Sequence, residues 1–212
     1  MNRRNFGRLC AAAAMGGWGA LSCSSAAAEG DVKAFDTRWT ASPQWYQDAY
    51  ADGYRLAVLS TNVWDQNAPS PQAAEQLGYA LDAGLRIAAY TRNPRWYQAG
   101  IEACGPHTGQ LSFFCLDVEI DPGVPVTHAM VDGVRSMGVS PLIYSSSGMW
   151  PHVMGNDTSF ADLPLWDAAH GNPNWTPYGG WTGRVGVQTT EEAVFNGVAI
   201  NLSSFSAGFL GV

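Results

Sequence analysis

The stretch LSFFCLDVE, residues 111–119, decides the fold of this chain. It is apolar almost without interruption up to Asp117, and a second acid, Glu119, follows two positions later. A near-continuous apolar run of this length is typical of a strand that is buried on both faces of a parallel sheet. The stretch therefore predicts a central strand that ends in two carboxylates.

Similar apolar runs occur on both sides of this strand and alternate with segments of helical character. The other early strands are expected at residues 32–36, 54–60, 85–90 and 139–144, and helices at 43–52, 69–83, 96–104, 125–137 and 148–154. Later apolar runs, at 163–168, 184–189 and 198–202, lie between Gly, Pro, Asn and Trp with little helix. This order predicts an α/β fold, an irregular TIM-like (β/α)5(β)3 barrel whose sheet is parallel, formed by one domain over residues 29–212.

The composition excludes several classes of protein. Of the 212 residues, 46% are hydrophobic and 14% are charged, which excludes intrinsic disorder. If residues 1–28 are removed, 8 basic and 18 acidic residues remain, a net charge of −10, and Lys33 is the only lysine. Nucleic acid is therefore not an expected partner, because a binding protein needs basic side chains to neutralise phosphates. Anionic membrane surfaces are disfavoured for the same reason.

The first 28 residues have the pattern of an export signal. Adjacent Arg3 and Arg4 precede a small-residue apolar stretch, and small residues at 25–28 offer a cleavage site. The paired arginines resemble a bacterial twin-arginine signal, with an ordinary secretory signal as the alternative and lipidation at Cys23 as a third. No later run reaches 18 apolar residues, so stable membrane insertion is not expected. We expect a secreted protein or one of the periplasm or cell envelope.

Export also determines how the cysteines and histidines are interpreted. The mature chain keeps Cys104 and Cys115, and in an oxidising compartment these two are expected to form a disulfide, with two buried thiols as the alternative. The four histidines and these cysteines show no spacing typical of metal ligands. The sequence thus predicts no metal and no cofactor.

Polar and aromatic residues stand at the carboxyl ends of the expected strands, where barrels of this kind place their active sites. Asp36 ends the first strand, and Asp117 and Glu119 end the fourth. We expect these three acids to be catalytic. The substrate-binding candidates at the other strand ends are Tyr90, Tyr144, Trp166, Asp167, Gln188 and Asn201.

The pair Asp117 and Glu119 carries most of the chemical argument. Two residues apart on a strand, the two carboxyls share one face and are about 6.6 Å apart along the backbone. Burial and mutual repulsion push their pKa values apart, which supplies one acid and one anion near neutral pH. The alternative is two ordinary surface acids at a strand end. Tryptophans on the expected site face favour a carbohydrate groove, although each could instead be a core residue: Trp39, Trp64, Trp96, Trp150, Trp166, Trp175 and Trp181.

Taken in order, these motifs resemble the family 25 glycoside hydrolases, the Chalaropsis-type lysozymes or N-acetylmuramidases. The resemblance spans about residues 32–205 and is carried by Asp36 and by LDVE (116–119), LIYS (142–145), LW (165–166), VQT (187–189) and VAIN (198–201). It implies an irregular barrel of five βα units and three further strands. It also implies that Glu119 donates a proton to the glycosidic oxygen, that Asp117 stabilises the transition state through the substrate's N-acetyl group, and that Asp36 lines the same subsite. Tyr144 and Gln188 would contact substrate.

The chain departs from the family pattern near the site. Ala199 stands where the family usually has an Asp on the last strand, Asp167 stands where it tends to be aliphatic, and residues 58–62 lack the family's Lys-Ala-Thr-Glu. The leading hypothesis is a glycosidase that cleaves a β-linked, N-acetylated polysaccharide such as peptidoglycan. A glycan-binding barrel with little catalysis and a glycosidase for another polysaccharide remain the alternatives. We expect a monomer, although no sequence feature determines the oligomeric state.

Overall fold

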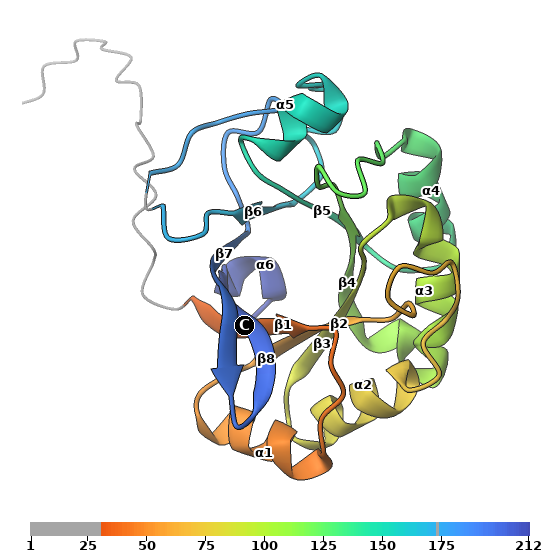
Figure 1. Ribbon diagram of the computed structural model, residues 1–212, viewed down its shortest axis with the longest axis vertical. Helices are drawn as coiled ribbons and strands as arrows, with labels where there is room; N and C mark the ends of the chain where they lie inside the picture. The colour runs from red at the N-terminus through yellow and green to blue at the C-terminus, as the bar shows by residue number, and fades with distance from the viewer. Residues whose placement is uncertain (1–30, 173) are drawn as a thin grey trace, which may run out of the picture.

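Eight strands close into a barrel in the order of the chain (Figure 1). The computed structural model describes residues 31–172 and 174–212, so the export signal expected at residues 1–28 lies outside the described part. The strands are β1 (Val32–Thr37), β2 (Leu56–Ser60), β3 (Arg86–Thr91), β4 (Leu111–Asp117), β5 (Pro141–Ser145), β6 (Leu165–Ala168), β7 (Gly186–Phe195) and β8 (Val198–Phe205). The (β/α)5(β)3 class predicted from the sequence is confirmed.

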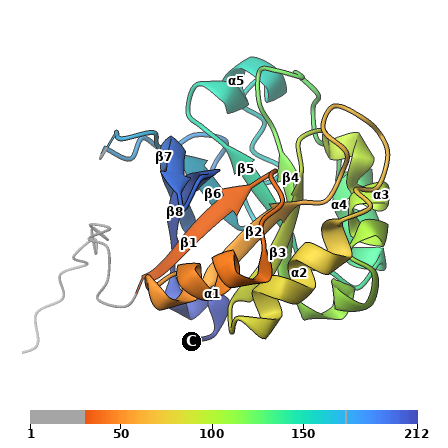
Figure 2. The ribbon, with the colours of Figure 1, turned by 60° about the horizontal axis from the view of Figure 1, so that its bottom comes forward.

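Helices cover the outside of the barrel along its first five strands, as Figure 2 shows for α1 to α4. They are α1 (Pro43–Ala51), α2 (Ala73–Asp82), α3 (Tyr97–Ala103), α4 (His128–Ser136), α5 (Met149–Met154) and, after the last strand, α6 (Ala207–Leu210), with 3-10 turns η1 (Pro94–Trp96) and η2 (Gly105–Gln110). Local sequence explains several helix ends. The Ser42 side chain caps α1 by accepting from the Trp45 N–H, and Gly84 and Gly138 follow α2 and α4 in the left-handed region, which favours glycine. Within the described residues, no helix has the length and apolarity needed to cross a membrane.

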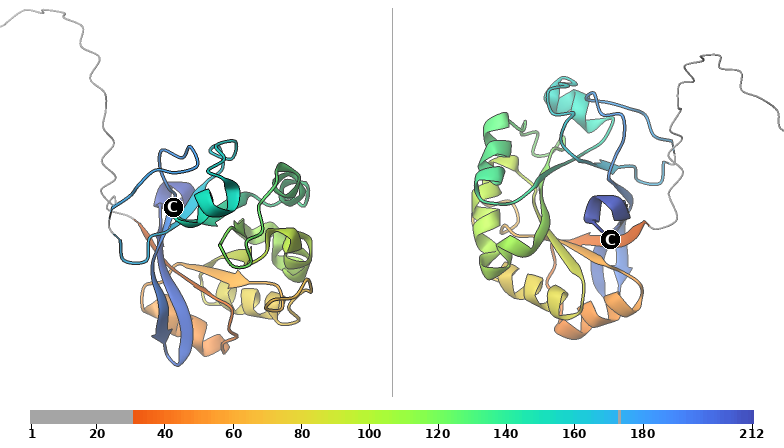
Figure 3. Two further views of the ribbon diagram at one scale, coloured as in Figure 1. Left: turned by 45° about the horizontal axis from the view of Figure 1, so that its top comes forward. Right: turned by 180° about the vertical axis from the view of Figure 1, so that it is seen from behind.

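The last strand runs against the others. β1 to β7 form parallel neighbours, whereas β8 pairs antiparallel with both β1 and β7 and so closes the barrel. The expectation of a wholly parallel sheet is therefore wrong at β8. β7 and β8 extend past the barrel as a hairpin (Figure 3), longer than the sequence pattern indicated. Asn196 and Gly197 turn this hairpin with φ of 43° and 81°, and an Asn-Gly pair is a strong hairpin signal that the sequence analysis did not use.

Side chains alternate between two apolar layers along each strand. Phe114 and Leu116 of β4 face the helices, whereas Phe113 and Cys115 face the barrel interior. Phe205 of β8 stacks on Phe113 with ring centroids 5.4 Å apart and fills the interior below the carboxyl ends of the strands. This alternation places every second residue of β1, β3, β4 and β5 in the interior.

The same alternation separates the two cysteines. Cys104 packs in the outer layer beneath α3 and donates its thiol to the carbonyl oxygen of Gly100, whereas Cys115 lies in the inner layer. Both are free thiols, and the wall of the barrel stands between their layers. The predicted disulfide is therefore absent, and the alternative of two buried thiols is the one observed.

We expect reduction with dithiothreitol to leave the melting temperature unchanged, because no disulfide constrains the unfolded chain. Alkylation followed by peptide mapping checks this directly. Cys104 and Cys115 should both be modified after unfolding without reductant, and both should be protected in the folded protein. If reductant lowered the melting temperature, and the cysteines of the unfolded protein were not alkylated without reductant, the two cysteines would form a disulfide after all.

Candidate active site

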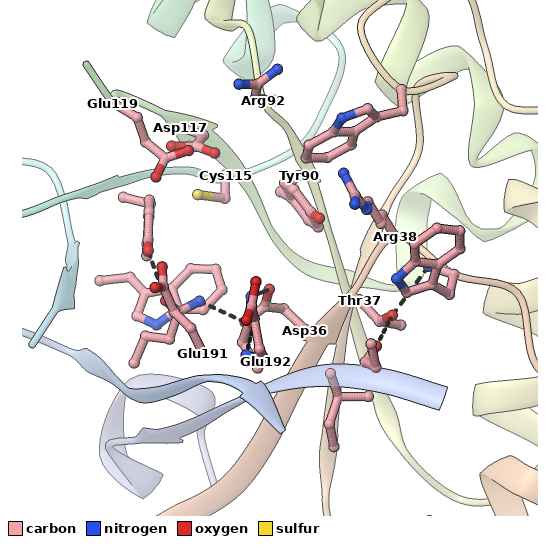
Figure 4. A pocket seen from close by; sticks show the side chains of 18 of the residues that line it. Asp36, Thr37, Arg38, Tyr90, Arg92, Cys115, Asp117, Glu119, Glu191 and Glu192 are labelled. Atoms are coloured by element: carbon pink, nitrogen blue, oxygen red, sulfur yellow. Dashed lines mark hydrogen bonds between the residues drawn. The ribbon is translucent and has the colours of Figure 1, made fainter. Parts of the chain in front are cut away.

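A cavity of about 620 Å³ opens at the carboxyl ends of the parallel strands (Figure 4). It gathers eight of the nine acids and binding residues that the sequence singled out: Asp36, Tyr90, Asp117, Glu119, Tyr144, Trp166, Gln188 and Asn201. Asn201 reaches the cavity by a different route from the one expected. It lies within the antiparallel β8 rather than at a carboxyl end, and it sits beside Asp36 because these two residues are paired in register.

Asp36 lies at the base of the cavity with a complete set of partners. The Gln188 side chain donates to its Oδ1 at 2.8 Å, and the Asn201 side chain donates to its Oδ2 at 2.9 Å. Tyr144 in turn donates its hydroxyl to the Gln188 Oε1 at 2.7 Å. Burial raises the pKa of Asp36 to about 6, and the two amide hydrogen bonds oppose that rise. Asp36 is thus a carboxyl that titrates near neutral pH.

Asp117 and Glu119 form a second carboxyl group in the cavity. Asp117 is the last residue of β4 and is 6% exposed, whereas Glu119 lies two residues further along and is less buried. The Asp117 Oδ1 is buried with no donor among the described residues. Burial, followed by the charge of Glu119, raises the pKa of Asp117 well above its usual range. Burial also raises the pKa of Glu119, which Asp117 and Arg92 counteract.

Burial raises the pKa of both carboxyls, and Glu119 adds to the rise at Asp117, so a proton on the pair favours Asp117 over Glu119. The Asp117 residue lines the cavity. A ligand N–H there would stabilise the anionic form of Asp117 and shift the proton towards Glu119. Two neighbouring carboxyls with raised pKa values are the arrangement that acid catalysis with charge stabilisation requires.

The opposite wall of the cavity is aromatic and cationic. Arg38 lies over the rings of Trp39 and Trp64, at 4.9 Å and 4.2 Å from their centroids (Figure 4). Trp39 is 53% exposed, and Arg38 has no acidic partner among the residues that the structure describes. Arg92 lies at 5.0 Å from Trp64 but is ion-paired with Asp65 and with Asp121. Partly exposed indole rings beside a guanidinium with no acidic partner among the described residues suit a sugar that carries polar or anionic substituents.

Sequence reasoning missed this cationic wall and the acids of the β7 hairpin. Glu191 and Glu192 line the cavity from a bulge in β7, where the pairing with β8 shifts register. Arg38 follows Asp36 by two residues and Arg92 follows Tyr90 by two, so the alternation used for Asp117 and Glu119 could have found both arginines. The bulge of β7 that carries Glu191 and Glu192 has no comparable signal in the sequence. Cys115, expected in a disulfide, also lines the cavity.

Asp167 is the one predicted site residue that the structure places away from the cavity. It follows the inward-facing Trp166 and so points outward, where it accepts from the Tyr178 hydroxyl at 3.0 Å and pairs with Arg184 at 2.5 Å. It holds the segment after β6 against the barrel. Of the seven tryptophans expected near the site, only Trp39, Trp64 and Trp166 line the cavity, and Trp150 and Trp181 are buried core residues.

No group of three or more His, Cys, Asp or Glu side chains within residues 31–172 and 174–212 is arranged to hold a metal ion. The cavity is lined by carboxyls, amides, hydroxyls, guanidinium groups and the Cys115 thiol.

Comparison with known proteins confirms the resemblance to the family 25 glycoside hydrolases. No family model matches the chain. Counting factor 50 of Dictyostelium discoideum is 31% identical over 168 residues, which cover 76% of this chain and 50% of that protein. A probable GH family 25 lysozyme 3 of the same organism is 29% identical over 96 residues, 43% of this chain and 20% of the relative. The chain thus spans half the length of the first relative and a fifth of the second.

The solved structures agree on the fold. A muramidase from Trichobolus zukalii superposes with a TM-score of 0.63 at 19% identity, over 85% of this chain and all of that one. A family GH25 lysozyme from Aspergillus fumigatus gives 0.63 at 18% identity, over 84% of this chain and 94% of its own. At this level of identity the likeness shows that the barrel is shared.

The buried Asp36 makes stability depend on pH. Its pKa is about 6 in the folded state and near 3.8 when unfolded, so between these values only the folded chain holds the proton. Stability therefore falls as pH rises through this window, by about 3 kcal/mol for this group. Urea unfolding between pH 4 and 7 should show a flatter profile for Asp36→Asn than for wild type or for the exposed control Asp162→Asn. If the unfolding free energy changed with pH to the same extent in all three proteins, the raised pKa of Asp36 would be contradicted.

Asp167 is expected to be structural. Asp167→Asn leaves Arg184 without its partner in a mostly buried pair and should cost about 3 kcal/mol of unfolding free energy. Asp132→Asn removes an exposed pair with Arg135 and should cost less than about 0.5 kcal/mol. Chemical denaturation measures the loss of unfolding free energy in both variants. Equal losses would contradict a structural role for Asp167.

Proposed function

We propose that this relative of the family 25 glycoside hydrolases is itself a glycosidase that cleaves a β-linked, N-acetylated polysaccharide, with peptidoglycan as the first substrate to test. One observation carries the proposal. Two neighbouring carboxyls, Asp117 and Glu119, lie in a cavity that is also lined by the exposed indole rings of Trp39 and Trp64. The shared barrel and the sequence similarity to probable family 25 lysozymes support it.

Glu119 is the proton donor in this proposal, and Asp117 is the stabilising carboxylate. A substrate acetamide N–H at the Asp117 carboxyl, which lines the cavity, would donate to it and stabilise its anionic form. The hydrogen bond lowers the pKa of Asp117, so the shared proton moves to Glu119, which is the more accessible of the two. Glu119 then protonates the glycosidic oxygen as the bond to the sugar breaks, and the anionic Asp117 stabilises the positive charge that develops.

Asp36 and its amide partners would bind the same sugar. Tyr144 donates to Gln188 at 2.7 Å and Gln188 donates to Asp36 at 2.8 Å, so a hydroxyl that displaces one of these contacts meets an ordered set of donors and acceptors. Tyr90, Trp166 and Asn201 complete the wall around this subsite. We assign these residues to substrate binding rather than to the chemical step.

The indole rings of Trp39 and Trp64 would stack on a neighbouring sugar, with Arg38 between them to meet a polar or anionic substituent. Substrate of this kind lies outside the cytoplasm, which agrees with an export signal of twin-arginine type at residues 1–28. The protein would act there as a monomer on its polysaccharide, without nucleic acid as a partner.

A glycan-binding barrel with little catalysis is the second candidate. Ala199 lines the cavity at the position where the resemblance leads one to expect an acid, so one carboxylate is missing from the wall. A binding protein does not need the protonated carboxyl pair, and the persistence of Asp117 and Glu119 is what favours the enzyme.

The test measures new reducing ends released from purified peptidoglycan. Glu119→Gln removes the proton and should lower the rate about 10²- to 10⁴-fold, with the fold intact. Glu102→Gln, on the exposed face of α3, is the matched control and should retain the wild-type rate.

A folded Glu119→Gln protein with full activity would exclude Glu119 as the acid. Absence of release by wild type, together with saturable binding of glycan fragments, would establish the binding candidate. Absence of both would require screening of other polysaccharides and would contradict peptidoglycan as the substrate.

A further inference from the structure

His170 extends the hydrogen bonds around Asp36 beyond the cavity wall. It follows β6, and its side chain is 32% exposed. Its Nε2 lies 3.0 Å from the Gln188 Oε1 and 3.1 Å from the Glu191 Oε1. A line of polar contacts therefore runs from Glu191 through His170 and Gln188 to Asp36.

The partners determine where the imidazole proton sits. Three oxygen atoms lie within 3.5 Å of the His170 Nε2. The Gln188 amide oxygen and a Glu191 carboxylate oxygen are acceptors, and the Tyr144 hydroxyl, at 3.5 Å, directs its own hydrogen to Gln188. The Nε2 must therefore carry hydrogen, in either the neutral or the charged form of the ring. His170 thus acts as a donor at this position.

The amide of Gln188 has only one useful orientation. Its Nε2 donates to Asp36 at 2.8 Å, while its Oε1 accepts from Tyr144 at 2.7 Å and from His170. If the amide flipped, its oxygen would face the Asp36 carboxylate, and its NH₂ would face the His170 N–H. Tyr144 and His170 both donate to the Gln188 Oε1. These two bonds therefore hold the Gln188 Nε2 against Asp36.

We propose that His170 is a positioning residue, which through Gln188 keeps a hydrogen-bond donor directed at Asp36. Glu191 holds the imidazole from the other side, and the bulge of β7 between Thr190 and Ala193 brings that carboxylate into reach. The catalytic consequence rests on the function proposed above, but the positioning itself does not.

The backbone, rather than the imidazole, anchors the loop that follows β6. The N–H groups of Ala169 and His170 both donate to the Gln188 carbonyl, at 3.0 and 3.2 Å. The imidazole is therefore not required to hold the chain in place. The titratable groups beside the imidazole are Tyr144 and Glu191. Asp36 lies beyond Gln188, and Glu119 is close enough to interact electrostatically with His170.

The experiment follows the Asp36 carboxyl by ¹³C NMR during a pH titration of the full chain, with its signal identified by its loss in Asp36→Asn. His170→Asn removes the donor, because the shorter amide does not reach Gln188, and Asn tolerates the φ of 42° at this position. His170→Gln retains a donor at the reach of Nε2 without the charge of the ring. His152→Asn, on the exposed side of α5, is the matched control.

The titration midpoint of Asp36, about 6 in wild type, should rise by about one pH unit in His170→Asn, because the bond from Gln188 lowers the pKa of Asp36. His170→Gln and His152→Asn should keep the wild-type midpoint. An unchanged midpoint in His170→Asn overturns the proposal. An equal rise in His170→Asn and His170→Gln also overturns it, in favour of a simple effect of the imidazole charge.

If a glycan is cleaved, the limb of the pH profile of kcat/KM that depends on Asp36 should shift in His170→Asn by as much as the NMR midpoint. In His170→Gln this limb should stay at the wild-type pH. Lack of turnover with every substrate would contradict the proposed function and leave the titration as the deciding measurement for His170. The two proposals therefore fail separately.

Discussion

A side chain on a barrel strand faces either the helices or the interior, and the positions of most functional groups here depend on that alternation. Asp36, Tyr90, Asp117 and Tyr144 each lie two residues beyond an interior apolar residue of the same strand. They therefore arrive in one cavity from four different strands. The same constraint sends Asp167 outward to Arg184 and separates Cys104 from Cys115. A shift of one residue in any strand would exchange the two sets.

The apolar interior below the cavity explains the electrostatics above it. Phe113, Phe205 and Trp166 pack against one another beneath the acids, with Phe205 centroids at 5.4 Å and 5.3 Å from its two neighbours. Water is thereby excluded from one side of Asp36 and Asp117, and burial is the largest cause of the raised pKa of each. Packing that stabilises the barrel thus also produces carboxyls that hold protons near neutral pH.

The antiparallel β8 supplies what a parallel strand could not. Its pairing with β1 sets Asn201 directly opposite Asp36, and its hairpin with β7 creates the bulge that carries Glu191 and Glu192 to the cavity. Gln188 stands between these elements, with Asp36 on one side and Tyr144 and His170 on the other. The site is therefore assembled across the seam where the barrel closes, from residues that lie as many as 165 positions apart in the chain.

The sequence by itself determined the barrel class, the carboxyl ends of the early strands and the acids Asp36, Asp117 and Glu119, because apolar runs and a two-residue alternation are local properties that survive without knowledge of the neighbours. The tertiary structure alone decided the direction of β8, the bulge of β7, the outward position of Asp167 and the free state of the cysteines. It also brought Glu191 and His170 to the site. These features depend on which strands pair and in which register, and such contacts between distant residues leave no periodic mark in a single sequence.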